Sequence, residues 1–489
     1  MDNAPPKPTF PLHAGRTGND ELLAQIAAFC QRVGMAESTF GRRVVNDGKL
    51  VARLRFGGRV TTQTVDRINA FIARKLAERG AGPAARTAAP RLAAVMAGSR
   101  SNGSRALTAA GEGDVQSRFR FYDNRQKYLL FVSTCTEKWV VAKRIDAELD
   151  NLKPRPPALR VFDAGCGDGT VLTRLMRSMH DKFPNVPFYI VGKEISLEDV
   201  RLALEKMADR FYEHPSTVLV MTNMYYSEAP WLRPNSLAAA SGLLWHELAL
   251  AGSTAGQFER QITDLQDFLS QNWTAKISSV TGNPIYERPV VLVIYRDDHK
   301  LLLDSVRPRQ GAVRADFDLV IASQPYRARA PVAFKAAKVI APLARALGPG
   351  GRLIGIHSCG GDPGLEIIRR VWPAENPFLM DRHQLLKATK QALGPDARAL
   401  NFNAYSDQRS LFRYHMHTLP SEISSSIGTS TLLAAWNAAI YVAQIEDERL
   451  EAVMTDGRYL DATREVLQRQ GGLWFQNESY VISRHRFSA

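Results

Sequence analysis

The sequence predicts an α/β protein with a doubly wound, mostly parallel sheet, preceded by a small all-α domain. Three observations support this fold class. Short apolar runs alternate with helical patterns between residues 160 and 357, as in sheets whose strands are joined by crossover helices. A glycine-rich turn joins the first run to the next helix, at residues 163–170. The first 116 residues show only short helices and a linker-like stretch.

The length and composition indicate a globular protein of several domains. A chain of 489 residues, 45% hydrophobic and 23% charged, suggests about three domains that each bury a core. No apolar run approaches the ~18 residues that a membrane span needs, and the N-terminus lacks the regions of a signal peptide. Four scattered cysteines without metal-ligand spacing fit a reducing cytosol. We therefore expect a cytoplasmic protein without a metal site, of undetermined oligomeric state.

The positive charge is concentrated in the first quarter of the chain. The formal net charge is +14, and residues 1–120 carry 19 Lys and Arg against 9 Asp and Glu. A basic region on a nearly balanced body indicates a polyanionic partner, most often nucleic acid. A solubilising basic tail is the alternative.

Residues 1–78 are predicted to form a helical domain. Apolar residues recur at helical spacing, and Glu37 to Val45 and Leu50 to Leu54 predict two short helices between longer ones. Thr61 and Thr62 are placed to cap a fourth helix. The two longer helices would present these apolar positions: Leu22, Leu23, Ile26, Ala27, Cys30, Val65, Ile68, Phe71 and Ile72.

In helix lengths and apolar positions, this region resembles helix-turn-helix domains of the phage-repressor type. The resemblance covers roughly 55 residues and implies binding to DNA phosphates. A small helical docking domain is the alternative. Residues 79–116, rich in Ala, Gly, Arg, Ser and Pro, predict a flexible basic linker. The basic residues free to meet phosphates would be Arg42, Arg43, Lys49, Arg53, Arg55, Arg59 and Arg67.

A third domain is expected over residues 117–489, and the glycine-rich turn lies near its start. Val161 and Phe162 end an apolar strand that Asp163 closes, and a helical pattern resumes at Val171. Glycines let backbone N–H groups approach a ligand closely, and a helix N-terminus then points at that ligand. The glycines of the turn are Gly165, Gly167 and Gly169.

Two further strands are followed by polar residues at their carboxyl ends. Residues 188–192 form an apolar run that leads to Glu194, and residues 217–221 lead to Asn223. A carboxylate at the end of the second strand is placed to accept hydrogen bonds from two ribose hydroxyls. A side-chain amide at the end of the third strand can read an adenine edge.

These three elements resemble the class I S-adenosylmethionine-dependent methyltransferases, over about residues 120–484. The resemblance implies a seven-stranded, Rossmann-like sheet and S-adenosylmethionine as cofactor. It places Asp163 and the glycine turn at the methionine end, Glu194 at the ribose and Asn223 beside the adenine. A dinucleotide-binding domain is the rival, but its third glycine would fall at Thr170. The sequence departs from the family's pattern in the 31-residue separation of Asp163 and Glu194 and in having Asn223 where an acid is more usual.

A long α+β insertion is predicted at residues 226–316, where a connection between strands is usually short. Leu237 to Leu250 and Phe258 to Leu269 predict helices. Pro289 to Tyr295 and Lys300 to Val306 predict a hairpin. The insertion would be a substrate cap with an aromatic surface, or Trp245 and His246 would belong to a helix–helix core. Its aromatic and imidazole residues are Tyr225, Tyr226, Trp231, Trp245 and His246.

The fourth strand, Phe317 to Ala322, leads into Ser323-Gln-Pro-Tyr326. This tetrapeptide resembles the motif of amino-group methyltransferases. The Ser323 oxygen and the Gln324 carbonyl would accept the hydrogens of an amino group and direct its lone pair at the methyl carbon. Pro325 would fix the backbone, and Tyr326 would stack on a planar substrate. The alternative is a simple strand-end turn.

The remaining chain completes the doubly wound pattern. Val332 to Leu347 predicts a helix and Arg352 to His357 a fifth strand. Leu432 to Val453 predicts one long helix, in a helical insertion at about residues 419–470 before a last strand, Leu473 to Ile482.

The leading hypothesis is a methyltransferase that acts on an amino nitrogen of a nucleic acid, with a duplex base flipped out to reach the site. One alternative is a DNA-binding transcriptional regulator whose methyltransferase-like body senses the cofactor or a small molecule. Another is a small-molecule or protein methyltransferase with a docking appendage.

Overall fold

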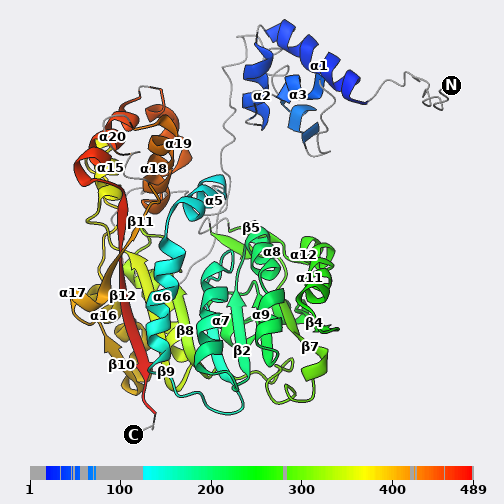
Figure 1. Cartoon of the computed structure of the whole chain (residues 1–489), viewed down its shortest axis with the longest axis vertical. Coiled ribbons are helices and arrows are strands. Elements are labelled where there is room, and N and C mark those ends of the chain that lie inside the picture. Colours follow the sequence, from blue (N-terminus) through cyan, green and yellow to red (C-terminus); the bar gives the residue numbers. More distant parts are fainter. Residues whose placement is uncertain are drawn as a thin grey trace, which may run out of the picture. The chain divides into compact units, whose positions relative to one another are not determined.

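A computed structural model of the chain divides into two compact units, residues 1–111 and residues 112–489 (Figure 1). The predicted linker at 79–116 lies outside the described residues. The structure describes residues 18–33, 35–45, 47, 50–55, 64–65, 67–69, 71–72, 125–278, 283–418, 423, 427–455 and 457–486.

The first unit is helical, as predicted. Its helices are α1 (Gly18–Val33), α2 (Glu37–Val45) and α3 (Leu50–Arg55), and residues 67–69 and 71–72 are also helical. The rings of Phe29, Phe40 and Phe71 meet edge to face, with centroids 5.6–6.0 Å apart. The predicted cap at Thr61 and Thr62 lies outside the described residues. The buried core confirms most of the predicted apolar positions and consists of Leu22, Ile26, Phe29, Cys30, Phe40, Leu50, Val51, Leu54, Ile68, Phe71 and Ile72.

Two of the basic residues predicted to be free are ion-paired within this unit. Arg53 pairs with Asp47 at 2.9 Å, and Arg55 pairs with Glu37 at 2.6 Å. Both arginines remain more than half exposed, so water weakens these pairs. Arg42 and Arg67 are exposed. Lys49 and Arg59, and the side chain of Arg43, are outside the description.

The second unit is built on a ten-stranded, mostly parallel sheet, in the order β10-β12-β9-β8-β1-β2-β3-β7-β4, with β11 paired to β12. The doubly wound pattern is confirmed, because the chain runs outward in both directions from β1. The four strands that carry the predicted site residues all form. Their bounds are β1 (Leu159–Asp163), β2 (Phe188–Lys193), β3 (Thr217–Thr222) and β8 (Phe317–Ser323); the others are β9 (Leu347–Ser358), β10 (Leu400–Asn403), β11 (Leu411–His415) and β12 (Trp474–Arg484).

The predicted count of seven strands is wrong because the insertion adds β4 and β7 to the sheet and β11 pairs with β12 at its other end. β7 (Val290–Arg296) pairs antiparallel with β3, and β4 (Leu244–Leu250) pairs parallel with β7. The prediction of a helix through residue 250 is therefore also wrong. The helix α10 (Leu237–Ser241) ends at Gly242, and the apolar residues after it pair with β7. Trp245 and His246 lie on a strand, not in a helix–helix core.

The predicted hairpin at 289–306 is half correct. Its first run is β7, but residues 300–306 form turns. Leu303 and Val306 are buried, whereas Leu301 and Leu302 are exposed. Buried positions three residues apart fit a turn and not the two-residue alternation of a strand. A separate two-stranded sheet, β5 (Ala275–Ile277) with β6 (Pro284–Tyr286), completes the insertion.

Helices cover both faces of the large sheet, and a separate apolar core lies beneath the helices of each face. One face carries α6 (Glu137–Leu149), α7 (Thr170–Lys182), α8 (Leu197–Glu205), α9 (Ala208–Glu213), α11 (Ala255–Thr263) and α12 (Gln266–Asn272). The other carries η1 (Ala229–Trp231), α13 (Val332–Phe334), η3 (Lys335–Ile340), α14 (Ala341–Arg345) and α16 (Arg382–Leu393).

A third core joins the helical insertion to the segment before β1. The predicted helix 432–453 is wrong as one element, because α18 (Thr429–Val442) and α19 (Asp447–Val453) are separated at Gln444, whose φ is +53°. This third core includes α5 (Arg125–Thr134), α15 (Pro363–Val371) and α20 (Arg458–Gln470). The short elements elsewhere are η2 (Asp297–His299), η4 (Gly394–Ala399) and α17 (Asp407–Ser410).

Among the described residues, no helix is long and apolar enough to cross a membrane.

Candidate functional site

The predicted site residues gather at the carboxyl ends of β1, β2, β3 and β8. β1 pairs with β2 on one side and with β8 on the other, so the chain direction along the sheet reverses there. Ligands of open α/β sheets bind in the crevice at this reversal. The position of β1 therefore places Asp163, Glu194 and Ser323 at the same edge of the sheet, where such a crevice would lie.

The turn after β1 is shaped by its glycines. Gly167 and Gly169 have φ of +52° and +76°, a region that favours glycine. A Cβ on Gly169 would lie 2.8 Å from the Ala203 Cα of α8. A Cβ on Gly165 would meet nothing within 4 Å, so open space lies beside that backbone. α7 starts directly after this turn without a side-chain cap, and its first N–H groups are suited to an anionic ligand group.

The Glu194 carboxylate ties the end of β2 to this turn. Its Oε2 accepts a hydrogen bond from the Gly167 N–H at 3.0 Å. Its Oε1 accepts from the N–H groups of Ile195 at 2.7 Å and Ser196 at 2.9 Å. A carboxylate has about four acceptor positions, so about one remains for a ligand. The predicted acceptance of two ribose hydroxyls would require one of these backbone bonds to be replaced.

Asp163 is buried at the base of the turn. Its Oδ1 accepts a hydrogen bond from the Gly165 N–H at 3.2 Å. Burial raises the pKa of Asp163 to about 6, opposed by that N–H and by the charge of Lys138. A buried acid at this position would be stabilised as an anion by a cationic ligand group.

The segment before β1 contacts the turn. Tyr128 of α5 donates to Asp168 Oδ1 at 3.2 Å. Lys206 of α8 donates to Asp168 Oδ2 at 2.7 Å. Burial alone would raise the pKa of Asp168, but Lys138, Lys206 and Thr170 lower it to about 2. Asp168 therefore stays anionic beside the turn.

Sequence reasoning missed Lys138 and Lys206, and it did not predict the particular role of Tyr128. The available signal for Tyr128 was the dense run of aromatic residues around it, at residues 119–131. No sequence pattern marks the two lysines, because their position depends on how α6 and α8 pack.

Both polar atoms of the Asn223 side-chain amide form hydrogen bonds with backbone groups of the protein. Its Nδ2 donates to the Arg288 carbonyl and its Oδ1 accepts from the Val290 N–H, both at 2.9 Å. The buried side chain thus continues the β3–β7 pairing. A contact with adenine remains a prediction, and it would require the amide to leave these partners.

Tyr226 connects the β3 end of the sheet edge to the β8 end. Its hydroxyl donates to the Pro325 carbonyl at 2.7 Å, and Lys193 Nζ lies 5.0 Å from its ring centroid. Burial, with the charges of Glu194 and Asp163, raises the pKa of Tyr226. This tyrosine, predicted as part of a cap, contacts the tetrapeptide at the end of β8.

The first two residues of that tetrapeptide present free acceptors. Ser323 is half-buried at the end of β8, and Gln324 has an unusual φ of +49°. Within the described part of the chain, no residue donates a hydrogen bond to the Ser323 hydroxyl or the Gln324 carbonyl. The Gln324 N–H is held by the Ile356 carbonyl at 2.9 Å, which fixes the direction of this turn. The arrangement suits an amino group that needs two acceptors.

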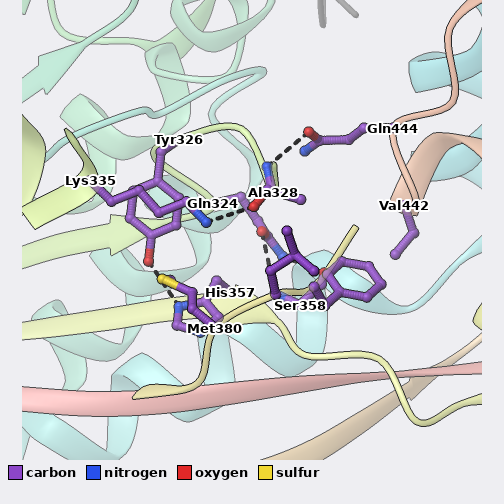
Figure 2. Close-up of a pocket in the computed structure, with 11 residues that line it drawn as sticks. Gln324, Tyr326, Ala328, Lys335, His357, Ser358, Met380, Val442 and Gln444 are labelled. Atoms are coloured by element: carbon purple, nitrogen blue, oxygen red, sulfur yellow. Dashed lines mark hydrogen bonds between the residues drawn. The ribbon is translucent and has the colours of Figure 1, made fainter. Parts of the chain in front are cut away.

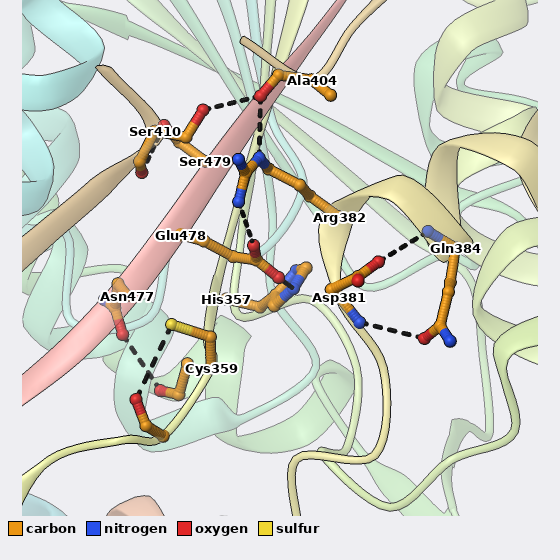
Figure 3. A network of polar contacts seen from close by, with 12 residues as sticks. His357, Cys359, Asp381, Arg382, Gln384, Ala404, Ser410, Asn477, Glu478 and Ser479 are labelled. Carbon is orange, nitrogen blue, oxygen red and sulfur yellow. Dashed lines mark hydrogen bonds and ion pairs between the residues drawn. The ribbon is translucent and has the colours of Figure 1, made fainter. Parts of the chain in front are cut away.

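Tyr326 instead lies in a buried polar network (Figure 3 shows its inner part). Its hydroxyl is 2.9 Å from His357 Nδ1, and His357 Nε2 is 2.8 Å from Glu478 Oε1. Arg382 donates to Glu478 Oε2 at 2.9 Å. Burial raises the pKa of Glu478, but His357 and Arg382 outweigh it and hold that pKa below its usual value. With 8% of its surface exposed, Tyr326 does not present its ring for stacking in this conformation.

Comparisons with known proteins give weak similarities to methyltransferases. No protein-family model matches the chain, and no curated protein matches it significantly. Among solved structures, a geranyl diphosphate methyltransferase in complex with GPP and sinefungin is 12% identical, covering 71% of this chain and 78% of its own, with a TM-score of 0.27.

Two other solved structures give similar values. The rRNA methyltransferase aviRa from Streptomyces viridochromogenes is 15% identical over 44% of this chain and 72% of its own, with a TM-score of 0.21. PKMT2 from Rickettsia typhi in complex with AdoHcy is 11% identical over 71% of this chain and 53% of its own, with a TM-score of 0.24. At these values the matches assign neither an activity nor an acceptor to this chain.

Proposed function

We propose that the second unit binds S-adenosylmethionine and directs its methyl group to an amino nitrogen. The observation that carries this proposal is the position of the Asp163 turn, tied to Glu194, directly beside the free acceptors of Ser323 and Gln324. The residues fit such a cofactor. Asp163 and Asp168 suit its ammonium and sulfonium charges, the N–H groups at the start of α7 suit its carboxylate, and Glu194 suits its ribose.

The bound cofactor would supply an electrophilic methyl group, and the protein would supply positioning. The Ser323 hydroxyl and the Gln324 carbonyl would accept the two hydrogens of the amino group. That geometry directs the nitrogen lone pair away from both oxygens and toward the methyl carbon. After transfer the nitrogen loses one proton to water. The tetrapeptide would therefore act by positioning the amino group and not by acid–base catalysis.

Nucleic acid is the acceptor class that we propose first, supported by the basic helical first unit. Its exposed Arg42 and Arg67 suit phosphates. The test is labelling of cell extract with radioactive methyl donor, followed by separate nuclease and protease digestion. Release of the label by nuclease supports this acceptor class, and a label in nucleic acid that persists after deletion of residues 1–116 would contradict the role of the first unit.

A small acidic molecule is the second candidate acceptor. It is favoured by the buried ammonium group of Lys335, which lies beside Tyr326 of the tetrapeptide. The first unit would then be a docking appendage. A label that resists both digestions and elutes with the small molecules would support this candidate. Cofactor binding without transfer to any fraction would favour the regulator alternative.

A further inference from the structure

A small cavity is lined in part by Gln324 and Tyr326 of the strand-four tetrapeptide (Figure 2). Its volume of about 20 Å³ is room for about one water-sized group. The ends of β8 and β9, the start of η3, the end of α18 and residues 378–380 contribute to its walls. The lining residues are Gln324, Tyr326, Ala328, Lys335, His357, Ser358, Phe378, Leu379, Met380, Val442 and Gln444.

Lys335 is a buried cation in this wall, with 2% of its surface exposed. Its Nζ donates to the Ala328 carbonyl at 2.6 Å and lies 4.9 Å from the Tyr326 ring centroid. No carboxylate in the described ranges forms an ion pair with it. Burying an ammonium group without a counter-ion is unfavourable. An anionic group that entered the cavity would remove this penalty.

The backbone around the cavity is held in unusual conformations. Only four non-glycine residues of the described chain have positive φ, and two of them, Gln324 (+49°) and Gln444 (+53°), line this cavity. Gln444 Oε1 accepts a hydrogen bond from the Ala328 N–H at 2.9 Å. The segment η3, which begins at Lys335, is a π-helix. Such strained backbone and π turns are concentrated at functional sites.

We propose that Lys335 binds one oxygen of an acidic group of the methyl acceptor, a carboxylate or a phosphate, while the acceptor's amino nitrogen lies at Ser323 and Gln324. The inference rests on the proposed function and names the charge of its substrate. The side-chain amide of Gln444 lies in the same wall and can donate a further hydrogen bond to the acid, whereas the Gln324 amide already donates to Ser358 Oγ at 2.9 Å. The apolar side chains of Phe378, Met380 and Val442 exclude water, which strengthens the ion pair.

The first test identifies the charge of the product. Full-length protein is incubated with labelled methyl donor and, separately, with the small-molecule and nucleic-acid fractions of cell extract. We expect a labelled product that an anion exchanger retains at neutral pH. Phosphatase treatment of the small-molecule fraction before the reaction would abolish labelling of an acceptor with a phosphate monoester, and carbodiimide capping would abolish labelling of a carboxylate-bearing one. Label in the nucleic-acid fraction would assign the acid to a backbone phosphate. A product without any acidic group would overturn the inference.

The second test uses Lys335→Met, with Lys338→Met as a matched control because Lys338 is exposed in the same helical segment. Lys335→Met should raise the KM for the acceptor fraction by at least about tenfold, since a lost ion pair of this kind is worth more than one factor of ten. Its Kd for S-adenosylmethionine should not change, and its Tm should not fall. Lys338→Met should match the wild type in all three.

The outcomes separate this inference from the proposed function. A wild-type protein that binds no cofactor contradicts both. A wild-type protein that transfers methyl groups, with an unchanged KM in Lys335→Met, contradicts the Lys335 inference alone. A loss of activity in Lys335→Met that follows a fall in Tm would show a structural lysine and would also contradict it.

The pH dependence gives a third readout. Burial lowers the pKa of Lys335 to about 8, and only the protonated amine binds an anion. The acceptor KM should therefore rise above pH 8, by up to about tenfold per pH unit. Tyr326 and His357 are the other titratable groups lining the cavity, and His357 pairs with Glu478. Lys335→Arg should remove the rise, because arginine stays charged; an unchanged rise would overturn the assignment to Lys335.

Discussion

Glu194 and Gly167 are joined by a hydrogen bond of 3.0 Å between the carboxylate Oε2 and the backbone N–H. The contact connects the end of β2 to the turn after β1, which lie 27 residues apart. It braces the turn at Gly167, whose φ is +52°, and leaves about one acceptor position of the carboxylate for a ligand. The proposed cofactor site is therefore organised before any ligand binds.

Replacement of Glu194 by Ala should weaken cofactor binding by at least about tenfold, through loss of a charge-assisted acceptor and of the order in the turn. The measurement is calorimetric titration with S-adenosylmethionine. The matched control is Glu198→Ala, which removes a half-exposed acid four residues later that pairs with Arg201 on the surface. Equal affinities of the two variants would contradict the assignment.

The glycines of the turn should separate stability from ligand binding. Gly169→Ala should lower the free energy of unfolding by about 2 kcal/mol or more, because φ is +76° and the new Cβ would contact Ala203. Gly165→Ala should leave stability within about 0.5 kcal/mol, since nothing lies within 4 Å, but should weaken cofactor binding by filling that space. Denaturant unfolding measures the stability, and calorimetry measures the cofactor affinity. A loss of stability in Gly165→Ala together with unchanged stability in Gly169→Ala would count against the site.

The tetrapeptide should separate catalysis from packing. Ser323→Ala should lower kcat roughly 10- to 100-fold and leave the Tm unchanged, because its hydroxyl has no protein partner in the described chain. Tyr326→Phe should instead lower the free energy of unfolding by about 1–2 kcal/mol, because it leaves His357 Nδ1 unpaired in a buried network. Methyl transfer and thermal unfolding test both variants. Full activity of Ser323→Ala would show that the segment is only a turn.

Cofactor affinity should fall as the pH drops below 6. The pKa of Asp163 is raised to about 6, so its negative charge is present above that pH and lost below it. The Kd for S-adenosylmethionine should rise by up to about tenfold per pH unit in this window. Asp168, with a pKa of about 2, stays charged throughout. Asp163→Asn should bind more weakly with a flatter pH profile, and an unchanged profile would assign the titration to another group.

The sequence was sufficient to predict the strand ends that form the crevice. Asp163, Glu194 and Ser323 each follow an apolar run with turn residues, so local pattern identifies them. The extension of the sheet by β4 and β7 was not predictable in this way. A short apolar run such as 244–250 suits a helix or a strand equally, and its long-range pairing with β7 decides between them.

The positions of the lysines of the site could not be predicted from local sequence either. Lys335 and Lys338 are three residues apart in one alanine-rich segment, and no local feature distinguishes them. Lys335 is buried and Lys338 is exposed only because η3 packs with one side against the sheet. Lys138 likewise reaches Asp163 and Asp168 through the placement of α6. Tyr326 was expected to be open to a substrate, but its partner His357 comes from a different strand, which local pattern does not reveal.

The central claim is that the Asp163 turn and Glu194 bind S-adenosylmethionine. Calorimetric titration of the purified full-length protein with this nucleoside tests it most directly. The structure predicts saturable binding to one site per chain, weakened in Glu194→Ala and preserved in Glu198→Ala. Absence of binding by the folded wild-type protein would contradict the claim.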